Sequence, residues 1–226
     1  MINNMDVIKR IKSIQRFLET NNLDGFIQPR SDSYLGEYVP LSDSRLEWIS
    51  GFSGSAGEIL ILRNTAILFV DSRYTIQAVN ETINTNIKVV LSSEESLTDY
   101  IENNLKKLKN IAFDPWLHSL SKIKFLLNVG KKNNLIFTSL KQNPIDLIWV
   151  SNREDAPKTK IKKHIKKYSG VSASIKIKKL CLKLKSFNAD SYIISQPDAI
   201  AWLLNIRGAD LKHTPIILTR AIIFKN

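Results

Sequence analysis

The chain has 226 residues, of which 43% are hydrophobic, and a formal net charge of +12. This composition excludes a disordered protein, and the single cysteine, Cys181, excludes a disulfide framework and a cysteine-based zinc site. No apolar run approaches the roughly 18 residues of a transmembrane helix, and the N-terminus lacks the apolar region of a secretory signal. We therefore expect a cytoplasmic protein that makes no use of a membrane.

The first 150 residues alternate between helical and strand patterns. Apolar residues recur at helical spacing from Val7 to Leu18, and Asp6 is the expected N-cap. Two apolar runs, 58–62 and 66–70, flank a three-residue turn, which predicts a β-hairpin. This order is typical of an α/β structure with a mixed sheet flanked by helices. The remaining predicted elements are helices at 43–48, 74–80, 97–108 and 122–129, and strands at 26–27, 87–91, 111–113 and 135–138.

A domain boundary is predicted where polar and turn-forming residues replace the apolar pattern. Residues 1–150 form the expected first domain, 151–160 a linker, and 161–226 part of a second α/β domain of similar type. In this second part Ser172 or Ser174 begins a helix that runs to Leu184. A strand at 190–195, a helical segment at 197–204 and one or two strands within 216–224 follow. A core of this size is marginal, so we expect this domain to be truncated.

The positive charge is concentrated in one segment. Eleven lysines and no acidic residue lie between Lys158 and Lys185, whereas the rest of the chain is nearly neutral. Clustered lysines neutralise phosphates, so residues 158–185 could form a basic module that contacts nucleic acid or anionic surfaces. Only Tyr168 lies near the first lysines, and the later ones fall on the solvated side of a helix with an apolar stripe. We therefore rank nucleic-acid binding second.

The glycine-rich run at 50–57 and the three histidines invite catalytic interpretations. The run has neither the order of a dinucleotide-binding turn, nor the lysine of a phosphate loop, nor the spacing of a nucleophile elbow. A structural tight loop is the better interpretation. His118, His164 and His213 are not paired at metal-ligand spacing. The sequence therefore predicts no catalytic residue and no metal ligand.

Arg73 follows the predicted strand 66–70 in the string Asp71-Ser-Arg73-Tyr74. A rigid strand end can aim a guanidinium into a cleft, where its planar fork grips a carboxylate or a peptide carbonyl. The alternative is that Arg73 only pairs with Asp71. The residues alone leave these two possibilities equally open.

Several strings together resemble the N-terminal half of the three-domain Xaa-Pro aminopeptidase (aminopeptidase P) family. They cover nearly the whole chain in order, which is more specific than any one motif. Ser72 stands where the family usually has glycine. The strings are Glu37-Tyr-Val-Pro40, Arg45, Ser50-Gly-Phe-Ser-Gly-Ser-Ala-Gly57, Asp71-Ser-Arg-Tyr74, Phe113-Asp-Pro115, Asn143-Pro-Ile-Asp-Leu-Ile-Trp149, Asp198-Ala-Ile-Ala-Trp-Leu-Leu-Asn-Ile-Arg-Gly-Ala-Asp210 and His213-Thr-Pro215.

The resemblance implies a creatinase-like N-terminal domain and part of a second one. The family hydrolyses the bond between an N-terminal residue and a following proline, with two divalent ions, usually manganese, that activate water. Their ligands belong to a C-terminal "pita-bread" domain that lies beyond the matched region. The chain itself is therefore expected to bind no cofactor, and whether it is an enzyme by itself stays uncertain. Within the matched region, Arg73 corresponds to an arginine that helps to hold substrate.

We therefore expect the non-catalytic N-terminal portion of an Xaa-Pro aminopeptidase, inactive by itself. A separately encoded catalytic domain and a second copy of the chain are the partners that this hypothesis leaves open. The alternative is the basic binding module at residues 158–185.

Overall fold

The computed structural model describes residues 4–104 and 107–225. The chain divides into two compact units, Met1–Glu154 and Asp155–Asn226. The interval between the end of α6 and residue 161 contains no helix or strand. None of the helices in the described parts of the chain is both long and apolar enough to cross a membrane.

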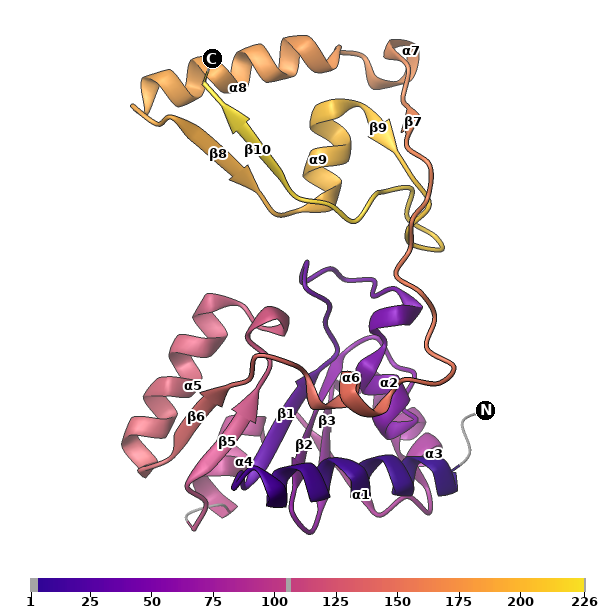
Figure 1. Ribbon diagram of the computed structural model, residues 1–226, viewed down its shortest axis with the longest axis vertical. Coiled ribbons are helices and arrows are strands. Elements are labelled where there is room, and N and C mark those ends of the chain that lie inside the picture. Colours follow the sequence, from indigo (N-terminus) through magenta and orange to yellow (C-terminus); the bar gives the residue numbers. More distant parts are fainter. Residues whose placement is uncertain (1–3, 105–106, 226) are drawn as a thin grey trace. The chain divides into compact units, whose positions relative to one another are not determined.

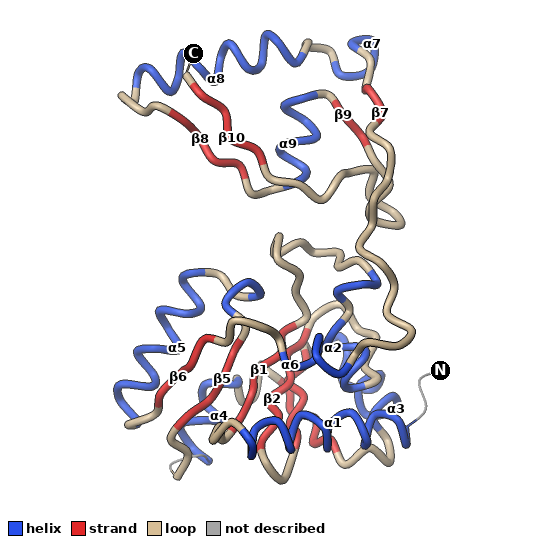
Figure 2. The backbone as a smooth tube through the Cα atoms, viewed as in Figure 1, coloured by secondary structure: helices blue, strands red, loops and turns tan. Residues whose placement is uncertain are grey.

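The first unit is a mixed six-stranded sheet with helices on both faces (Figures 1 and 2). The strand order is β4-β3-β2-β1-β5-β6, and only β2 runs antiparallel to its neighbours. The predicted α/β class with a mixed sheet flanked by helices is thus confirmed. The strands are β1 (Gly25–Pro29), β2 (Gly57–Leu62), β3 (Ala66–Val70), β4 (Ile87–Leu91), β5 (Asn110–Phe113) and β6 (Ile136–Ser139).

The helices divide the core of this unit into two layers. Buried residues of α1, α2, α3 and α6 cluster on one sheet face, and those of α4 and α5 on the other. The helices are α1 (Asn4–Thr20), α2 (Arg45–Ser50), α3 (Thr75–Thr82), α4 (Leu97–Asn104), α5 (Leu120–Asn133) and α6 (Pro144–Ile148). Short 3-10 turns lie at η1 (Leu41–Asp43), η2 (Ser72–Tyr74) and η3 (Pro115–Leu117).

Several predicted boundaries were wrong. Asp6 lies inside the first turn of α1 and is not its N-cap; an acidic side chain is also favoured there, because the helix dipole is positive at that end. Gly25 begins β1, and it is Asn22, with φ 53°, that takes the left-handed conformation after α1. Part of the helix predicted at 97–108 falls outside the described residues. Helix α6 was not predicted, because its apolar run is only one turn long.

The second unit is smaller and holds two short antiparallel pairs, β8–β10 and β7–β9. Its elements are β7 (Lys162–Lys163), α7 (Lys166–Ser169), α8 (Ala173–Ser186), β8 (Ser191–Ile194), α9 (Pro197–Leu204), β9 (Ile206–Arg207) and β10 (Ala221–Phe224). Ser172, one of the two predicted N-cap residues, caps α8. Residues 216–220 form no strand, and the Leu218 amide donates to the Asp210 carboxylate at 2.8 Å.

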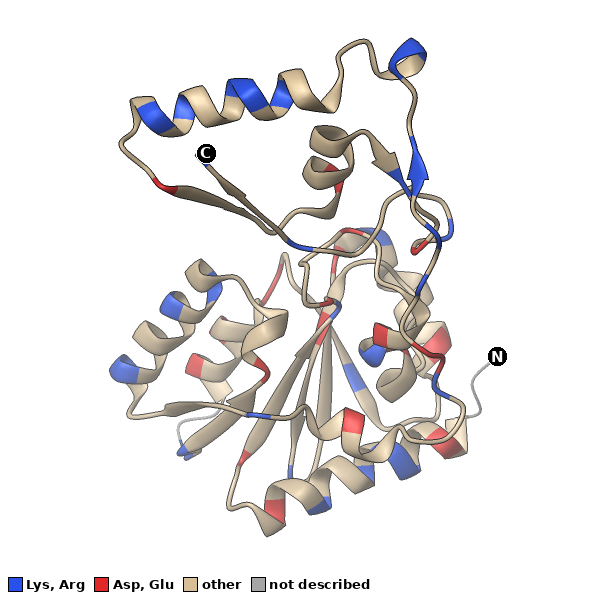
Figure 3. Ribbon diagram, turned by 45° about the horizontal axis from the view of Figure 1, so that its top comes forward, with Lys and Arg blue, Asp and Glu red and all other residues tan. Residues whose placement is uncertain are grey.

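The lysine-rich segment is almost wholly solvated. Figure 3 shows its basic residues along β7, α7 and α8. Ten of the eleven lysines are exposed, as a solvated helix face predicts, and Lys176 is the exception. Its ammonium is buried and donates to the Trp202 carbonyl and to Asn205 Oδ1, each at 2.7 Å. The expectation that all lysines of α8 face solvent was therefore wrong at this position.

Candidate functional site

The sheet topology of the first unit gathers polar side chains at one edge. Because β1, β3, β4, β5 and β6 are parallel, their carboxyl ends lie together with the amino end of the antiparallel β2. In open α/β sheets this is the edge where ligands bind. At this edge β1, β3 and β5 are followed by Arg30, Asp71 and Asp114, and the glycine-rich run leads into β2.

Arg73 lies at this edge, one residue into η2. The Asp71 carboxylate accepts from the Arg73 amide at 3.0 Å and from its Nε at 2.8 Å, so the pairing foreseen as the alternative is present. The side chain is nevertheless 67% exposed, and its Nη1 and Nη2 atoms form no hydrogen bond within residues 4–104 and 107–225. The pair therefore orients the guanidinium and leaves its outer fork open to a ligand.

The neighbouring acidic groups keep the Arg73 guanidinium protonated. Hydrogen bonding to Arg73 holds the pKa of the Asp71 carboxyl below its usual value. The pKa of the guanidinium is raised chiefly by Asp71, with smaller contributions from Tyr74 and from Glu37 in the loop after β1. Two loops of the edge therefore act on the same cation, which stays charged at every relevant pH.

The glycine-rich run supports the turn that carries Arg73. Ser55 Oγ and the Tyr74 hydroxyl are 2.6 Å apart, and the Tyr74 ring packs edge-on against Phe52. Deeper in the loop, Ser53 donates from its amide and its hydroxyl to the Glu81 carboxylate of α3, at 2.9 and 2.6 Å. Loop and turn are therefore held as one piece.

The glycines of this run are required by backbone shape. Gly51 has φ 80° and ends α2 in the left-handed conformation. A Cβ at Gly54 would lie 2.1 Å from the Phe52 ring, and one at Gly57 would lie 2.9 Å from the Phe69 carbonyl oxygen. The structural interpretation of this run is confirmed.

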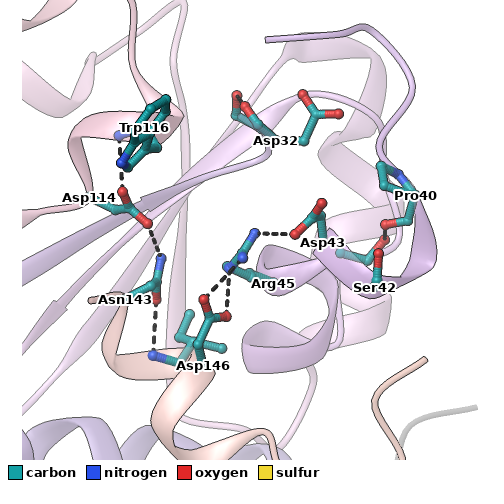
Figure 4. A network of polar contacts seen from close by, with 12 residues as sticks. Asp32, Pro40, Ser42, Asp43, Arg45, Asp114, Trp116, Asn143 and Asp146 are labelled. Atoms are coloured by element: carbon teal, nitrogen blue, oxygen red, sulfur yellow. Dashed lines mark hydrogen bonds and ion pairs between the residues drawn. The ribbon is translucent and has the colours of Figure 1, made fainter. Parts of the chain in front are cut away.

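A buried polar link joins three strand ends across the same edge, and Figure 4 shows its part between Asn143, Asp114 and Trp116. Asn143, which precedes α6, donates from Nδ2 to Gln28 Oε1 at 2.9 Å and to Asp114 Oδ2 at 3.1 Å. Its Oδ1 accepts from the Ile145 amide at 3.0 Å, which starts α6. The other oxygen of Asp114 accepts from the Trp116 amide at 3.0 Å. This link fixes the edge and leaves none of its own groups for a substrate.

A charged cluster lies beside this link (Figure 4). Arg45 binds Asp146 through Nε and Nη2 at 2.8 and 3.0 Å, and Asp43 through Nη1 at 2.8 Å. Arg153 adds an ion pair with Asp146 at 2.7 Å. Burial by itself lowers the pKa of Arg45, but the hydrogen bonds and charge of Asp146, with Asp43, outweigh it and raise that pKa. Arg45 is thus a buried connector of α2 to α6.

The histidines contribute no ligand cluster. His118 is buried against Phe113, and desolvation, with a smaller contribution from Lys122, lowers its pKa to about 4, so it is neutral near pH 7. His164 lies beside the Tyr168 ring and His213 is exposed in a turn. Within the described ranges no three His, Cys, Asp or Glu side chains are grouped to hold a metal ion. These residues do not fit a divalent-metal site, so no chemical step is assigned to a metal here.

Arg73 was predicted from the sequence, but the way in which its surroundings assemble was not. Asn143, Asp114 and Gln28 were not foreseen as one network, because they are far apart along the chain. The Asn143-Pro pair, typical of a capped helix start, was the available indication. Whether Arg73 contacts substrate remains a prediction.

Comparison with known proteins places the chain in a family. Residues 10–155 and residues 152–226 each match the family described as the Creatinase/Prolidase N-terminal domain. The probable Xaa-Pro aminopeptidase P of Penicillium rubens is 32% identical over 97% of this chain and 36% of its own length. That of Aspergillus flavus is 33% identical over 95% of this chain and 33% of its own length.

A solved structure shares the fold of nearly the whole chain. The X-prolyl aminopeptidase of Caenorhabditis elegans, described as a cytosolic enzyme with a di-nuclear active site, superposes with a TM-score of 0.86. It is 24% identical, and the match covers 99% of this chain and 38% of that one. The chain thus spans about a third of the length of the relatives it matches. With both of its units matched, the chain belongs to the creatinase/prolidase N-terminal domain family.

Proposed function

We propose that this chain forms the N-terminal, substrate-facing portion of an Xaa-Pro aminopeptidase. The observation that carries the proposal is the match of almost the whole chain, over about a third of their length, to such relatives. The reaction would be the metal-dependent release of an N-terminal residue that precedes proline. The remaining two thirds of such a protein would hold the two divalent ions and activate water.

Arg73 is the residue of this chain that we assign to substrate. Its open Nη atoms can donate to a peptide carbonyl or a carboxylate, and Asp71 fixes the direction in which they point. The contact would orient the peptide and would take no part in bond cleavage. The adjacent Ser55–Tyr74 contact is assigned to supporting the turn.

The test joins this chain to the part of the Penicillium rubens relative that lies beyond the matched region. With manganese added, the fusion should release the N-terminal residue of a short Xaa-Pro peptide. Arg73→Ala should lower kcat/KM roughly ten- to a hundredfold, the loss expected for one charged hydrogen-bonding contact. A fusion that folds, binds manganese and remains inactive would argue against the proposed function.

Arg63→Ala is the matched control. Arg63 is also a partly exposed arginine paired with an aspartate, Asp24, but it lies in the β2–β3 turn at the opposite edge of the sheet. Its replacement should leave kcat/KM unchanged. If both arginine variants lose activity equally, or if Arg73→Ala keeps full activity, then Arg73 has no substrate role.

A further inference from the structure

The two units repeat a helix-to-strand element. Residues 22–27 read Asn-Leu-Asp-Gly-Phe-Ile, and residues 188–193 read Asn-Ala-Asp-Ser-Tyr-Ile. Asn22 follows α1 and Asn188 follows α8, and both asparagines have φ 53°. The strands that come next, β1 and β8, each pair antiparallel with a later strand of their own unit, β2 and β10.

A second repeated element centres on a tryptophan at the end of a helix. Residues 48–54 read Trp-Ile-Ser-Gly-Phe-Ser-Gly in and after α2, and residues 202–208 read Trp-Leu-Leu-Asn-Ile-Arg-Gly in and after α9. The residue three places after each tryptophan, Gly51 or Asn205, is left-handed, with φ 80° and 51°. In each unit a short helix therefore ends in the same way.

In each unit a cationic side chain of the long helix contacts the tryptophan of the short helix: α1 contacts α2, and α8 contacts α9. Arg10 of α1 donates to the Trp48 carbonyl at 2.7 Å and lies over the indole ring, 4.4 Å from its centroid. Lys176 of α8 donates to the Trp202 carbonyl at 2.7 Å and lies 4.1 Å from that ring centroid. Arg10 and Lys176 stand the same number of positions before Asn22 and Asn188. Arg10 and Lys176 thus occupy equivalent positions in the two units.

The two units differ in what else covers the tryptophan. In the first unit Trp149, which follows α6, stacks on Trp48 with ring centroids 5.3 Å apart and an interplanar angle of 19°. The Arg153 guanidinium lies over Trp149 at 5.0 Å. In the second unit no aromatic ring of the described chain stacks on Trp202, and its side chain is 60% exposed.

We propose that Trp202, held by Lys176, is a docking site for an aromatic side chain carried on a short helix of another polypeptide segment. The occupant would have the chemistry of residues 143–153: a proline-started helical turn, a tryptophan directly after it, and an arginine four residues later. This docking site is inferred from the internal repeat alone, independently of the proposed function. Stacking is favoured here because Lys176 lies over the ring while 60% of the Trp202 side chain stays exposed, and a stacked aromatic pair adds to the free energy of burial.

The experiment appends a copy of residues 143–153 to the C-terminus of the chain through a flexible Gly/Ser linker. Tethering raises the effective concentration of the segment to the millimolar range, so that weak docking is populated. The readout is the indole Nε1–H resonance of Trp202, assigned from a Trp202→Phe variant. Docking should shift this resonance upfield by the ring current of the appended tryptophan and reduce its broadening by a soluble paramagnetic agent.

The matched control carries the same appended segment with alanine in place of its tryptophan, and it should leave the Trp202 resonance unchanged. Lys176→Arg should preserve the shift, because arginine occupies this position in the first unit, and Lys176→Met should diminish it. Identical Trp202 resonances for the tryptophan and alanine versions would overturn the proposal. So would a concentration-dependent shift in the unmodified chain, which would assign the Trp202 face to self-association.

Discussion

Replacing His118 by glutamine should make the first unit less sensitive to acid. Burial, with a smaller contribution from Lys122, lowers the pKa of His118 from its ordinary 6.5 to about 4. Between these values the unfolded chain binds a proton at this side chain and the folded chain does not. The free energy of unfolding therefore falls as the pH drops from about 6.5 to about 4, and it levels off below that range.

The pKa shift of His118 sets the size of this loss in the free energy of unfolding. A difference of about 2.5 pH units, at about 1.4 kcal/mol per unit, corresponds to about 3.5 kcal/mol for a fully effective shift, of which about 3 kcal/mol is lost by pH 4. Two carboxyls act in the opposite direction, since burial raises the pKa of Asp32 and of Glu47 and so favours their protonation in the folded state. Only the difference between the His118→Gln variant and its parent isolates the histidine.

The assay is urea unfolding at a series of pH values from 7 to 4, followed by tryptophan fluorescence. A Trp202→Phe background confines the fluorescence to Trp48, Trp116 and Trp149, which all belong to the first unit. The difference in unfolding free energy between the two proteins should change by about 3 kcal/mol in favour of the variant on acidification. A difference that stays constant across this range would show that His118 takes up its proton equally well in both states.

The remaining predictions concern other parts of the chain. Incubated alone with manganese, the chain should not cleave a short Xaa-Pro peptide; metal-dependent turnover above a blank preparation would contradict this. Hydrogen exchange should show stronger protection before Leu147 than after Lys158, because the second core is small and its lysines repel one another, and added salt should narrow the gap. The segment 158–185 should bind heparin or duplex DNA without sequence preference and lose that binding steeply with salt; selective binding at physiological salt would restore the basic-module hypothesis. Gly54→Ala should cost about 1–3 kcal/mol in thermal or urea unfolding, because the new Cβ overlaps Phe52, and an unchanged midpoint would show that the loop can relax.

Local chemistry allowed some elements to be predicted closely. Helix α9 was placed at Pro197–Leu204, where a proline starts the helix and Asn205 ends it in the left-handed conformation. The β2–β3 hairpin was likewise evident from two apolar runs around a short turn. In both cases a few neighbouring residues determine the backbone, so no distant contact is needed to infer it.

Long-range contacts account for what the sequence did not show. The burial of Lys176 depends on the Trp202 carbonyl and Asn205, which a helical pattern of α8 does not contain. A second domain of similar type was predicted, but the correspondence of individual elements between the two units was missed for a related reason. Most residue types differ between corresponding positions of the two units. Only the shared left-handed residues and the two cation–tryptophan contacts make the correspondence visible.

The contrast between two arginines explains why Arg73 remains the candidate for substrate. Arg45 is 9% exposed, and all three guanidinium nitrogens are engaged by Asp146 and Asp43, so it can bind nothing further without breaking the contact between α2 and α6. Arg73 forms a side-chain hydrogen bond only through Nε, lies over the Tyr74 ring at 5.4 Å, and is 67% exposed. A sequence shows both as an arginine near an aspartate. What separates a structural cation from a recognition group is the number of donors that the fold leaves open, and Arg73 retains two donor-bearing nitrogens where Arg45 retains none.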